Sequence, residues 1–262
     1  MNLTERVISK ARYLASILNR HRIRSCLQLE GPYLSYNEAI VKAHGYHDPV
    51  ILKKVQSAVC EVINNPCGYE RDGTVFSHYP KALKIRELLY KYLLRGSLVV
   101  DFGGGLGGTF INHRDLFDSS HKCIVVEQPN FVEAGRAIAI RYNFPINFLE
   151  SLDELHEKPD ILIVSAVLQY VNDLDLVLQG LAKLNSKIII LDRTAFIGRG
   201  PLKWWLQVEN TYYGTPVSYP FRPLELSIIL DAFQNYSILD RWTNPFDPQQ
   251  PAHRGLLLQR NS

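Results

Sequence analysis

The stretch Leu98-Val-Val-Asp-Phe-Gly-Gly-Gly-Leu-Gly-Gly-Thr109 decides the fold. It begins with a short apolar run that ends at Asp101, which is typical of a buried strand in a parallel sheet. Glycine then occupies five of the six positions from 103 to 108. Because glycine has no Cβ, such a loop lets a ligand touch the backbone, and a following helix offers its N-terminal N–H groups. The stretch therefore predicts a strand, a ligand-binding loop and a helix in succession.

Strand-like and helix-like segments alternate from this stretch onward. The expected strands are short, β-rich apolar runs at residues 98–102, 123–127, 146–149, 160–165, 187–192, 236–239 and 254–258. Helical patterns separate them near residues 108–117, 131–142, 173–184, 202–212 and 223–233. This alternation predicts an α/β fold with a doubly wound, mostly parallel seven-stranded sheet. The last two runs lie close together in the sequence, which suits an antiparallel closing pair.

The first part of the chain has a different pattern. Helical signals occur at residues 3–18 and near residues 35–43, 48–63 and 80–94, and a linker-like stretch with the turn signal Gly31-Pro32 follows the first of them. We therefore expect a helical N-terminal region or lid over residues 1–85. The ligand-binding sheet domain is expected over residues 86–262.

Composition excludes several classes of protein. The chain has 262 residues, of which 46% are hydrophobic and 21% are charged, and this balance is typical of a folded globular protein. No apolar run reaches the length of a membrane span, and the first residues do not form a secretory signal, so we expect a cytoplasmic protein. The net charge of +3 argues against a dedicated nucleic-acid binder.

The positive charge is concentrated near the N-terminus. Residues 1–24 hold six Lys and Arg residues against a single acidic residue. A basic amphipathic helix over residues 3–24 has two interpretations. Its apolar stripe packs on the protein itself, or it docks peripherally on the anionic inner face of a membrane, where a lipid-linked acceptor would be presented.

Two acidic residues at the ends of predicted strands indicate the ligand. The pattern Gly103-x-Gly105-x-x-Gly108 also fits a dinucleotide site, but the Asp101 carboxylate would repel a diphosphate and attract an amino group. The next strand ends in Glu127-Gln128, where a carboxylate accepts hydrogen bonds from vicinal ribose hydroxyls. Two acids at neighbouring strand ends therefore suit a ligand that has a cationic amino-acid group and a free ribose, and S-adenosylmethionine is such a ligand.

With Asp101-x-Gly103-x-Gly105-x-Gly107 and Glu127, residues 80–262 resemble the class I S-adenosylmethionine-dependent methyltransferases. The resemblance implies that the glycine loop cradles the methionine part of the cofactor and that Glu127 binds its ribose. It places Ser151, or Glu150 before it, near the adenine, and it places the end of the fourth strand near the reacting methyl group. The cofactor residues expected in this way are Asp101, Gly103, Gly105, Gly107, Glu127, Gln128, Ser151 and Ser165.

Further motifs resemble a narrower family. Gly31-Pro-Tyr-x-Ser-Tyr-Asn-Glu-Ala39, Tyr69-Glu-Arg-Asp-Gly73 and Leu191-Asp-Arg-Thr194 are similar to motifs of methyltransferases encoded among bacterial surface-polysaccharide genes. This resemblance implies O-methylation of a sugar, or of a lipid-linked or nucleotide-linked saccharide. It does not name the acceptor atom.

Four residues are candidates for roles in the reaction. His78 is the leading candidate for a general base, because a sugar hydroxyl is a poor nucleophile while protonated. Tyr170 and Arg193 follow the fourth and fifth strands, at the edge where open α/β sheets bind ligands. Arg193 is a candidate anchor for a phosphate or carboxylate of the substrate. Arg71 is a candidate to reach the cofactor's carboxylate from the lid.

Alternatives remain open at this point. One is an NAD(P)-dependent oxidoreductase or epimerase, and another is a non-catalytic protein that retains the methyltransferase fold. Methylation of nucleic-acid base amines is disfavoured, because Ser165-Ala-Val-Leu168 stands where such enzymes carry Asn-Pro-Pro-Tyr or Asp-Pro-Pro-Tyr. No cluster of His, Asp and Glu has metal-ligand spacing, so no metal is expected.

Overall fold

The structure is a computed structural model that describes residues 27–44, 49–65, 68–77, 84–197, 202–209, 216–243 and 253–261. The chain divides into two compact units. The small unit comprises residues 1–48 and 203–221, and the sheet unit comprises residues 49–202 and 222–262. These divisions do not coincide with the expected boundary at residue 85, since α3 (Pro49–Asn64) already belongs to the sheet unit. A lid role for residues 1–85 stays a prediction.

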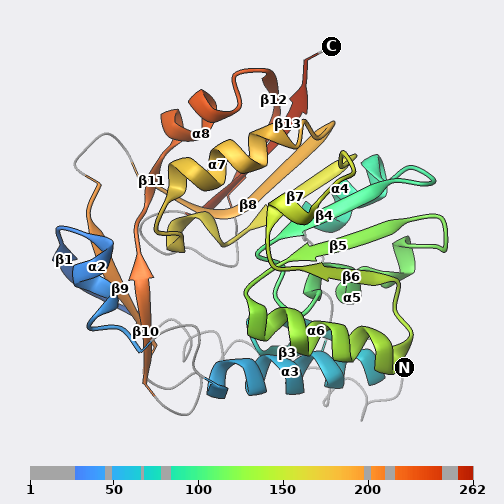
Figure 1. Ribbon diagram of the computed structural model, residues 1–262, viewed down its shortest axis with the longest axis horizontal. Coiled ribbons are helices and arrows are strands. Elements are labelled where there is room, and N and C mark those ends of the chain that lie inside the picture. The colour runs from blue at the N-terminus through green and yellow to red at the C-terminus, as the bar shows by residue number, and fades with distance from the viewer. Residues whose placement is uncertain are drawn as a thin grey trace, which may run out of the picture. The chain divides into compact units, whose positions relative to one another are not determined.

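The sheet unit is built on an eight-stranded sheet, as far as the described residues show. Seven of its strands follow the order β12-β13-β8-β7-β4-β5-β6, and the short strand β11 pairs with β8 beside this path (Figure 1). The parallel strands are β4 (Leu98–Phe102), β5 (Lys122–Val126), β6 (Ile146–Leu149), β7 (Ile161–Ser165) and β8 (Ile188–Ile197). The antiparallel pair at one edge is β12 (Tyr236–Thr243) and β13 (His253–Arg260), and β11 (Leu224–Glu225) adds a short parallel pairing with β8. The predicted doubly wound fold is therefore confirmed.

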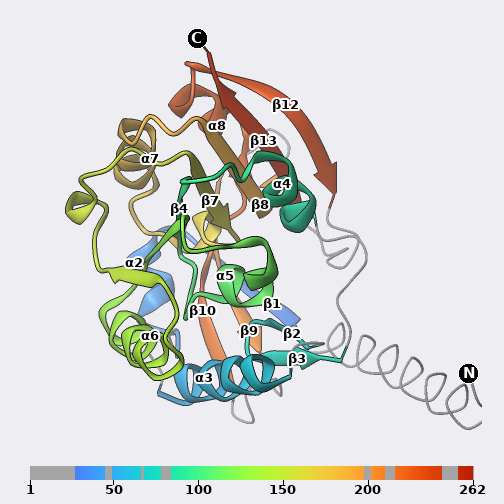
Figure 2. The same ribbon diagram turned by 90° about the vertical axis from the view of Figure 1, so that its right-hand side faces the viewer.

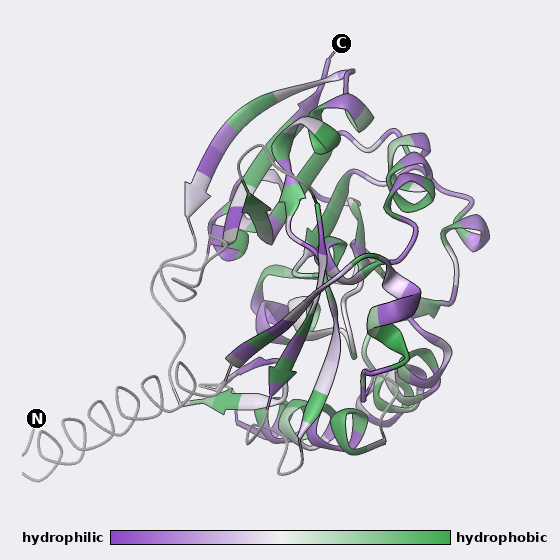
Figure 3. Cartoon of the chain, turned by 90° about the vertical axis from the view of Figure 1, so that its left-hand side faces the viewer, coloured by the Kyte–Doolittle hydropathy of each residue, from purple (hydrophilic) through white to green (hydrophobic). Residues whose placement is uncertain are grey.

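Both faces of this sheet are covered by helices. α7 (Leu174–Lys183) and α8 (Leu226–Ala232) pack on one face, and α4 (Lys84–Tyr92) with η1 (Arg114–Leu116) packs on the other (Figure 2). Successive side chains of one strand pack on opposite faces of the sheet, because side chains alternate in direction along a strand. Val100 of β4 belongs to the same apolar cluster as Leu178 of α7, whereas its neighbour Val99 belongs to the cluster of Leu89 on α4. The central strands are accordingly hydrophobic along their length (Figure 3).

The remaining elements of the sheet unit flank the carboxyl ends of the strands or cover the β6 edge. α6 (Pro129–Tyr142) packs so closely on β6 that a Cβ at Gly135 would lie 2.3 Å from the Phe148 ring. The shorter elements are the hairpin strands β2 (Tyr69–Arg71) and β3 (Thr74–Phe76), the helix α5 (Gly108–Asn112) and the 3₁₀ turns η2 (Leu152–Glu154) and η3 (Leu168–Tyr170).

The small unit corrects two predictions. Its sheet has the order β1-β9-β10, formed by β1 (Leu27–Tyr33), β9 (Trp204–Glu209) and β10 (Val217–Phe221), with α2 (Tyr36–Ile40) packed against it. The helix predicted over residues 202–212 is wrong, because Trp204, Leu206 and Val208 alternate along a strand and pack together with Ala39. The stretch predicted as a linker contains β1, which pairs with β9.

Two predicted features lie outside the described residues. These are the amphipathic helix over residues 3–24 and the candidate base His78. Among the helices that the structure does describe, none combines the length and the apolar character needed to cross a bilayer.

Candidate functional site

The carboxyl edge of the parallel strands gathers most of the predicted site residues. Five strands of the sheet unit end or bend at this edge, and each contributes polar or glycine residues there. These residues are Asp101 to Gly107 after β4, Glu127 and Gln128 after β5, Ser151 after β6, Ser165 at the end of β7 and Arg193 within β8. Ligands of open α/β sheets bind at this edge.

The glycine loop after β4 contains three residues in the left-handed region, with φ of 71° at Gly103, 57° at Gly105 and 83° at Gly107. Packing explains two of these glycines, because a Cβ at Gly103 would lie 2.6 Å from Val167 and one at Gly107 would lie 3.1 Å from Ile146. A Cβ at Gly105 would meet nothing within 4 Å. Gly105 is therefore the loop position whose backbone a ligand can approach.

Asp101 lies beneath this loop with an incomplete set of partners. Its side chain is 2% exposed, and a Cβ at Gly104 would lie 2.6 Å from the carboxylate. The Thr109 side chain hydrogen-bonds to it, but Oδ2 has no partner among the described residues. Burial raises the pKa of Asp101 to about 6, because a charge is disfavoured away from water. A cationic ligand group would offset this penalty.

Glu127 is held against the open part of the loop. Its carboxylate accepts hydrogen bonds from the backbone N–H of Gly105 and from that of Gln128, the latter at 2.6 Å. Burial raises the pKa of Glu127 to about 7, and the charge of Asp101 adds to the increase. Gln128 stands at the N-cap position of α6, and its Oε1 is buried without a partner among the described residues. The site thus offers acceptors on both sides of Gly105.

The two predicted serines have local partners. Ser151 forms a capping box with Glu154, in which its Oγ accepts from the Asp153 N–H at 3.2 Å and its own N–H donates to the Glu154 carboxylate at 2.9 Å. Ser165 accepts a long hydrogen bond of 3.4 Å from Arg193 Nε. Cofactor contacts by these two residues stay predictions.

A β-bulge in β8 orients Arg193. Two residues, Asp192 and Arg193, stand opposite the single residue Gly255 of β13, and Arg193 has a φ of 48°. The Asp192 carboxylate accepts from Trp242 Nε1 at 2.8 Å, while the Arg193 guanidinium turns to a different set of partners. A residue of this type with positive φ is strained, and such strain is concentrated at functional sites.

The Arg193 guanidinium meets the turn of the β2–β3 hairpin. Its Nη1 donates to Asp72 Oδ2 at 2.9 Å. Burial alone would lower the pKa of Arg193, but Asp72, Tyr69 and Asp192 raise it, so the group remains charged. The Asp72-Gly73 turn has φ of 52° and 77°, the pattern of a type I′ turn.

Sequence reasoning missed the role of Glu70 on this hairpin. Its backbone exchanges two hydrogen bonds with the side chain of Asn112 on α5, at 3.0 and 2.8 Å. Its Oε1 accepts from the Gly73 N–H at 2.8 Å, and its Oε2 would lie 3.1 Å from a Cβ on Gly108. Burial raises the pKa of Glu70 to about 7. The hairpin is therefore fastened to the helix that follows the glycine loop, and the Asp-Gly dipeptide is the signal that would have revealed the turn.

The remaining candidates in the described part of the chain are Arg71 and Tyr170. The distance between Arg71 Nε and Asp72 Oδ2 is 3.7 Å, and the Arg71 guanidinium lies 5.8 Å from the centre of the Phe76 ring. Tyr170 is the last residue of η3, the turn that follows β7 in the chain. In the described part of the chain, no group of His, Cys, Asp and Glu is arranged to hold a metal ion.

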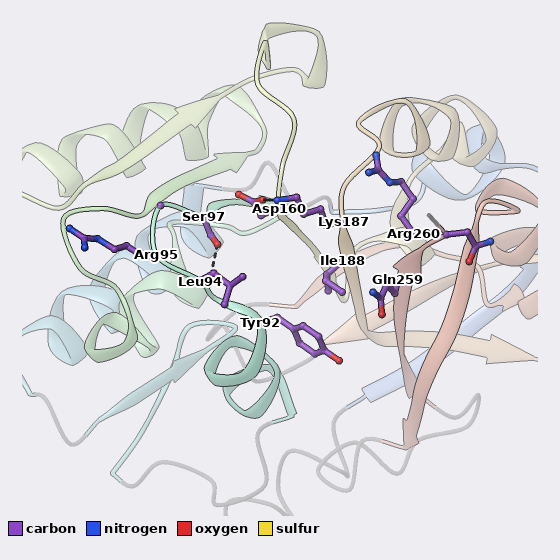
Figure 4. A pocket seen from close by; sticks show the side chains of 11 residues that line it. Tyr92, Leu94, Arg95, Ser97, Asp160, Lys187, Ile188, Gln259 and Arg260 are labelled. Carbon is purple, nitrogen blue, oxygen red and sulfur yellow. Dashed lines mark hydrogen bonds and ion pairs between the residues drawn. The ribbon is translucent and has the colours of Figure 1, made fainter.

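A cavity of about 560 Å³ lies elsewhere, at the amino ends of the parallel strands (Figure 4). Its lining includes Ser97, Asp160 and Lys187, which directly precede β4, β7 and β8. Lys187 Nζ and Asp160 Oδ1 form an ion pair of 2.6 Å there. This cavity is on the opposite edge of the sheet from the glycine loop and does not belong to the candidate site.

Comparison with known proteins gives structural but not sequence relatives. No family model and no curated protein matches the sequence. The chain resembles the 1,6-didemethyltoxoflavin-N1-methyltransferase of Burkholderia thailandensis at 13% identity, with a TM-score of 0.49 over 89% of this chain and 93% of that one. It also resembles the magnesium protoporphyrin IX methyltransferase of Synechocystis PCC 6803 at 16% identity, with a TM-score of 0.47 over 98% and 100%.

A third solved structure is the N-terminal domain of EvdMO1, determined in the presence of S-adenosylhomocysteine and D-fucose. It is 11% identical, with a TM-score of 0.48 over 80% of this chain and 97% of that one. At such low identity these likenesses concern the fold alone. What the chain does therefore has to be argued from its own site.

Proposed function

We propose that the chain is an S-adenosylmethionine-dependent methyltransferase. The observation that carries the proposal is the arrangement around Gly105, whose N–H donates to the Glu127 carboxylate and whose Cα faces open space. The Asp101 oxygen Oδ2, which has no hydrogen-bond partner among the described residues, lies under the same loop. Two acids on either side of an accessible backbone suit a ligand with a cationic amino group and a ribose diol.

The proposed roles follow from this placement. Asp101 attracts the ammonium group of the methionine part, and Glu127 accepts hydrogen bonds from the ribose hydroxyls. Gly103 and Gly107 shape the loop, and Gly105 lets its backbone approach the ligand. Ser151, Ser165, Gln128 and Arg71 are proposed as further cofactor contacts.

We further propose that the acceptor is a sugar or a lipid-linked or nucleotide-linked saccharide, as the resemblance to methyltransferases of surface-polysaccharide synthesis suggests. The cofactor supplies a methyl group on a positively charged sulfur. An acceptor oxygen forms a bond to the methyl carbon while the carbon–sulfur bond breaks, and the hydroxyl proton passes to a base. His78 is the proposed base, with Tyr170 beside the reacting groups, and alignment of the two reactants supplies much of the rate.

The first test is calorimetric binding of S-adenosylmethionine and S-adenosylhomocysteine to the full chain. Asp101→Asn and Glu127→Gln are each expected to weaken binding by about tenfold or more, because each removes a charge-assisted hydrogen bond. Asp231→Asn, on the exposed face of α8, is the matched control and should bind like the parent protein. A folded chain that binds neither compound would refute the proposal.

The second test is transfer of tritiated methyl groups to saccharide acceptors. Transfer that Asp101→Asn reduces would support the proposed enzyme. Binding of NADH in place of S-adenosylhomocysteine would favour an oxidoreductase or epimerase. Cofactor binding without transfer to any saccharide offered would contradict the proposed acceptor class, and it is the outcome expected of a non-catalytic protein with this fold.

A further inference from the structure

The Arg193 guanidinium has an open donor. Nη1 donates to Asp72 and Nε makes the long hydrogen bond to Ser165, whereas Nη2 makes no hydrogen bond within the part of the chain that the structure describes. The side chain is 18% exposed, so the fork lies mostly buried at the carboxyl edge of the sheet. Arginine binds carboxylates and phosphates most strongly through two parallel hydrogen bonds. The present pairing uses only part of that capacity.

The Asp72 carboxylate pairs only weakly with the Arg193 guanidinium. It is 56% exposed and sits on the tip of a two-residue hairpin turn. Solvent screens the charge of an exposed carboxylate, which weakens the ion pair that it forms. The left-handed backbone of Arg193 is strained, and a screened pair with Asp72 does not by itself account for keeping this residue in the bulge.

We propose that Arg193 is the binding site for an anionic group of the methyl acceptor, a phosphate or a carboxylate, and that Asp72 is the internal carboxylate which this group replaces. The proposal rests on the proposed methyltransferase function and deepens it by naming the substrate class. An anion that takes both Nη1 and Nη2 gains a bidentate contact, and Asp72 is left with its neighbour Arg71, whose Nε lies 3.7 Å from the same oxygen.

The charges around Arg193 are compatible with an arriving anion. Asp192 is turned away and bonded to Trp242. Glu70 and Asp101 lie close enough to Arg193 for its charge to lower their pKa values, yet burial, the larger effect, raises those values to about 7 and about 6. Burial therefore disfavours the charged form of each of these two acids. A cationic methyl donor at the glycine loop would add positive charge to the same region, so we expect anion binding to be favoured after the donor is bound.

The hairpin connects the two halves of the site. Asp72 contacts Arg193 from the turn, and Glu70, two residues earlier, is fastened to α5 directly behind the glycine loop. Release of Asp72 by the acceptor therefore acts on an element that also touches the donor loop.

The experiment measures binding of small anions by calorimetry to the full chain saturated with S-adenosylhomocysteine. The probes are inorganic phosphate and acetate, and glucose serves as the uncharged comparison. Asp72→Asn removes the internal competitor and should tighten binding of phosphate or acetate by about two- to fivefold, the equivalent of an exposed ion pair. Arg193→Lys should weaken it by about tenfold or more, because the fork is lost.

Asp115→Asn is the matched control. Asp115 of η1 forms an exposed bidentate pair with Arg86 of α4 in the same unit, so it tests whether removal of any paired carboxylate raises anion affinity. Equal anion affinity in Asp72→Asn, Asp115→Asn and the parent protein would overturn the proposal, and so would weaker binding in Asp72→Asn. If Arg193→Lys does not fold, the comparison of the two Asp→Asn variants decides alone.

The two arms distinguish the source of the anion. Preference for phosphate indicates a phosphorylated or nucleotide-linked acceptor, and preference for acetate indicates a sugar acid. Binding of S-adenosylhomocysteine is measured first in the same samples. Its absence refutes the proposed function, whereas its presence without anion binding refutes only the role given to Arg193.

Discussion

Replacing Asp101 by Asn is expected to make the protein more stable and less able to bind its cofactor. The carboxylate is buried, its Oδ2 has no described partner, and its pKa rises from 3.8 to about 6. Each tenfold change in a proton-binding constant corresponds to about 1.4 kcal/mol, so ionised Asp101 opposes folding by up to about 3 kcal/mol. Asn has nearly the same shape and carries no charge, and we expect it to remove much of this penalty.

The sign of the pH dependence follows from the raised pKa. Between about pH 4 and pH 6 the folded protein binds this proton more tightly than the unfolded chain, so stability falls as the pH rises through that window. The penalty is complete above the folded pKa. Urea unfolding at pH 8 should therefore show Asp101→Asn to be more stable by about 1–3 kcal/mol, the lower value applying if the new amide hydrogens find no acceptors. About half of the difference should remain at pH 5.

The same samples are then titrated with S-adenosylhomocysteine. The variant should bind about tenfold or more weakly, because the charged partner of the ammonium group is lost. Asp231→Asn, an exposed carboxylate on α8, controls for a general effect of charge and should change neither property. Asp101→Asn that is less stable than the parent protein at pH 8, or that binds with an unchanged Kd, would refute the reasoning.

The remaining predictions concern the glycine loop and its acids. Gly105→Ala should lower the free energy of unfolding by only about 1–2 kcal/mol, the penalty of a left-handed residue whose Cβ meets no clash. It should nevertheless weaken cofactor binding, because the new methyl group fills the space proposed for the ligand. An unchanged Kd in calorimetry would contradict contact between the cofactor and the backbone at this position. Gly103→Ala should cost more than about 2 kcal/mol in urea unfolding, because its Cβ would strike Val167, and a smaller loss would contradict the packing described. Cofactor binding should tighten from pH 5 to pH 8, because Asp101 and Glu127 have pKa values of about 6 and 7 and must ionise to bind the ligand. Binding should therefore release protons, and calorimetry in buffers of different ionisation enthalpy measures their number. Binding that does not change with pH would argue against a role for either acid. Glu127→Gln should flatten the upper part of that pH profile, and a profile identical to the parent's would remove Glu127 from the site.

The main sheet was predictable because its signals are local. Each parallel strand is a short β-branched run between helical patterns, and the acids Asp101 and Glu127 stand at strand ends that a parallel sheet must bring to one edge. The sequence does not show, in the same way, why each position of the loop is occupied by glycine. Gly103 is glycine because of Val167, which follows a different strand, and only the folded chain brings the two together.

The errors arose where partners are distant in the sequence. β9 reads Trp-Trp-Leu-Gln-Val-Glu, a short apolar run in which helix and strand are hard to distinguish without knowing what it packs against. Its strand partner β1 and its apolar partner Ala39 lie more than a hundred residues earlier. Glu70 was missed for the same reason, since its burial depends on Asn112 and Gly108 of α5.

The pairing of β1 with β9 also governs the order in which the protein is made. Leu27 pairs with Glu209, and all five parallel strands of the main sheet lie between them in the chain. As the protein emerges from the ribosome, β1 has no β9 to pair with until those five strands have been synthesised. A nascent chain that stalls before residue 203 lacks β9, so β1 has neither edge paired with a described strand, and such edges invite pairing with other chains. The small sheet can therefore form only after all five parallel strands of the main sheet have been made.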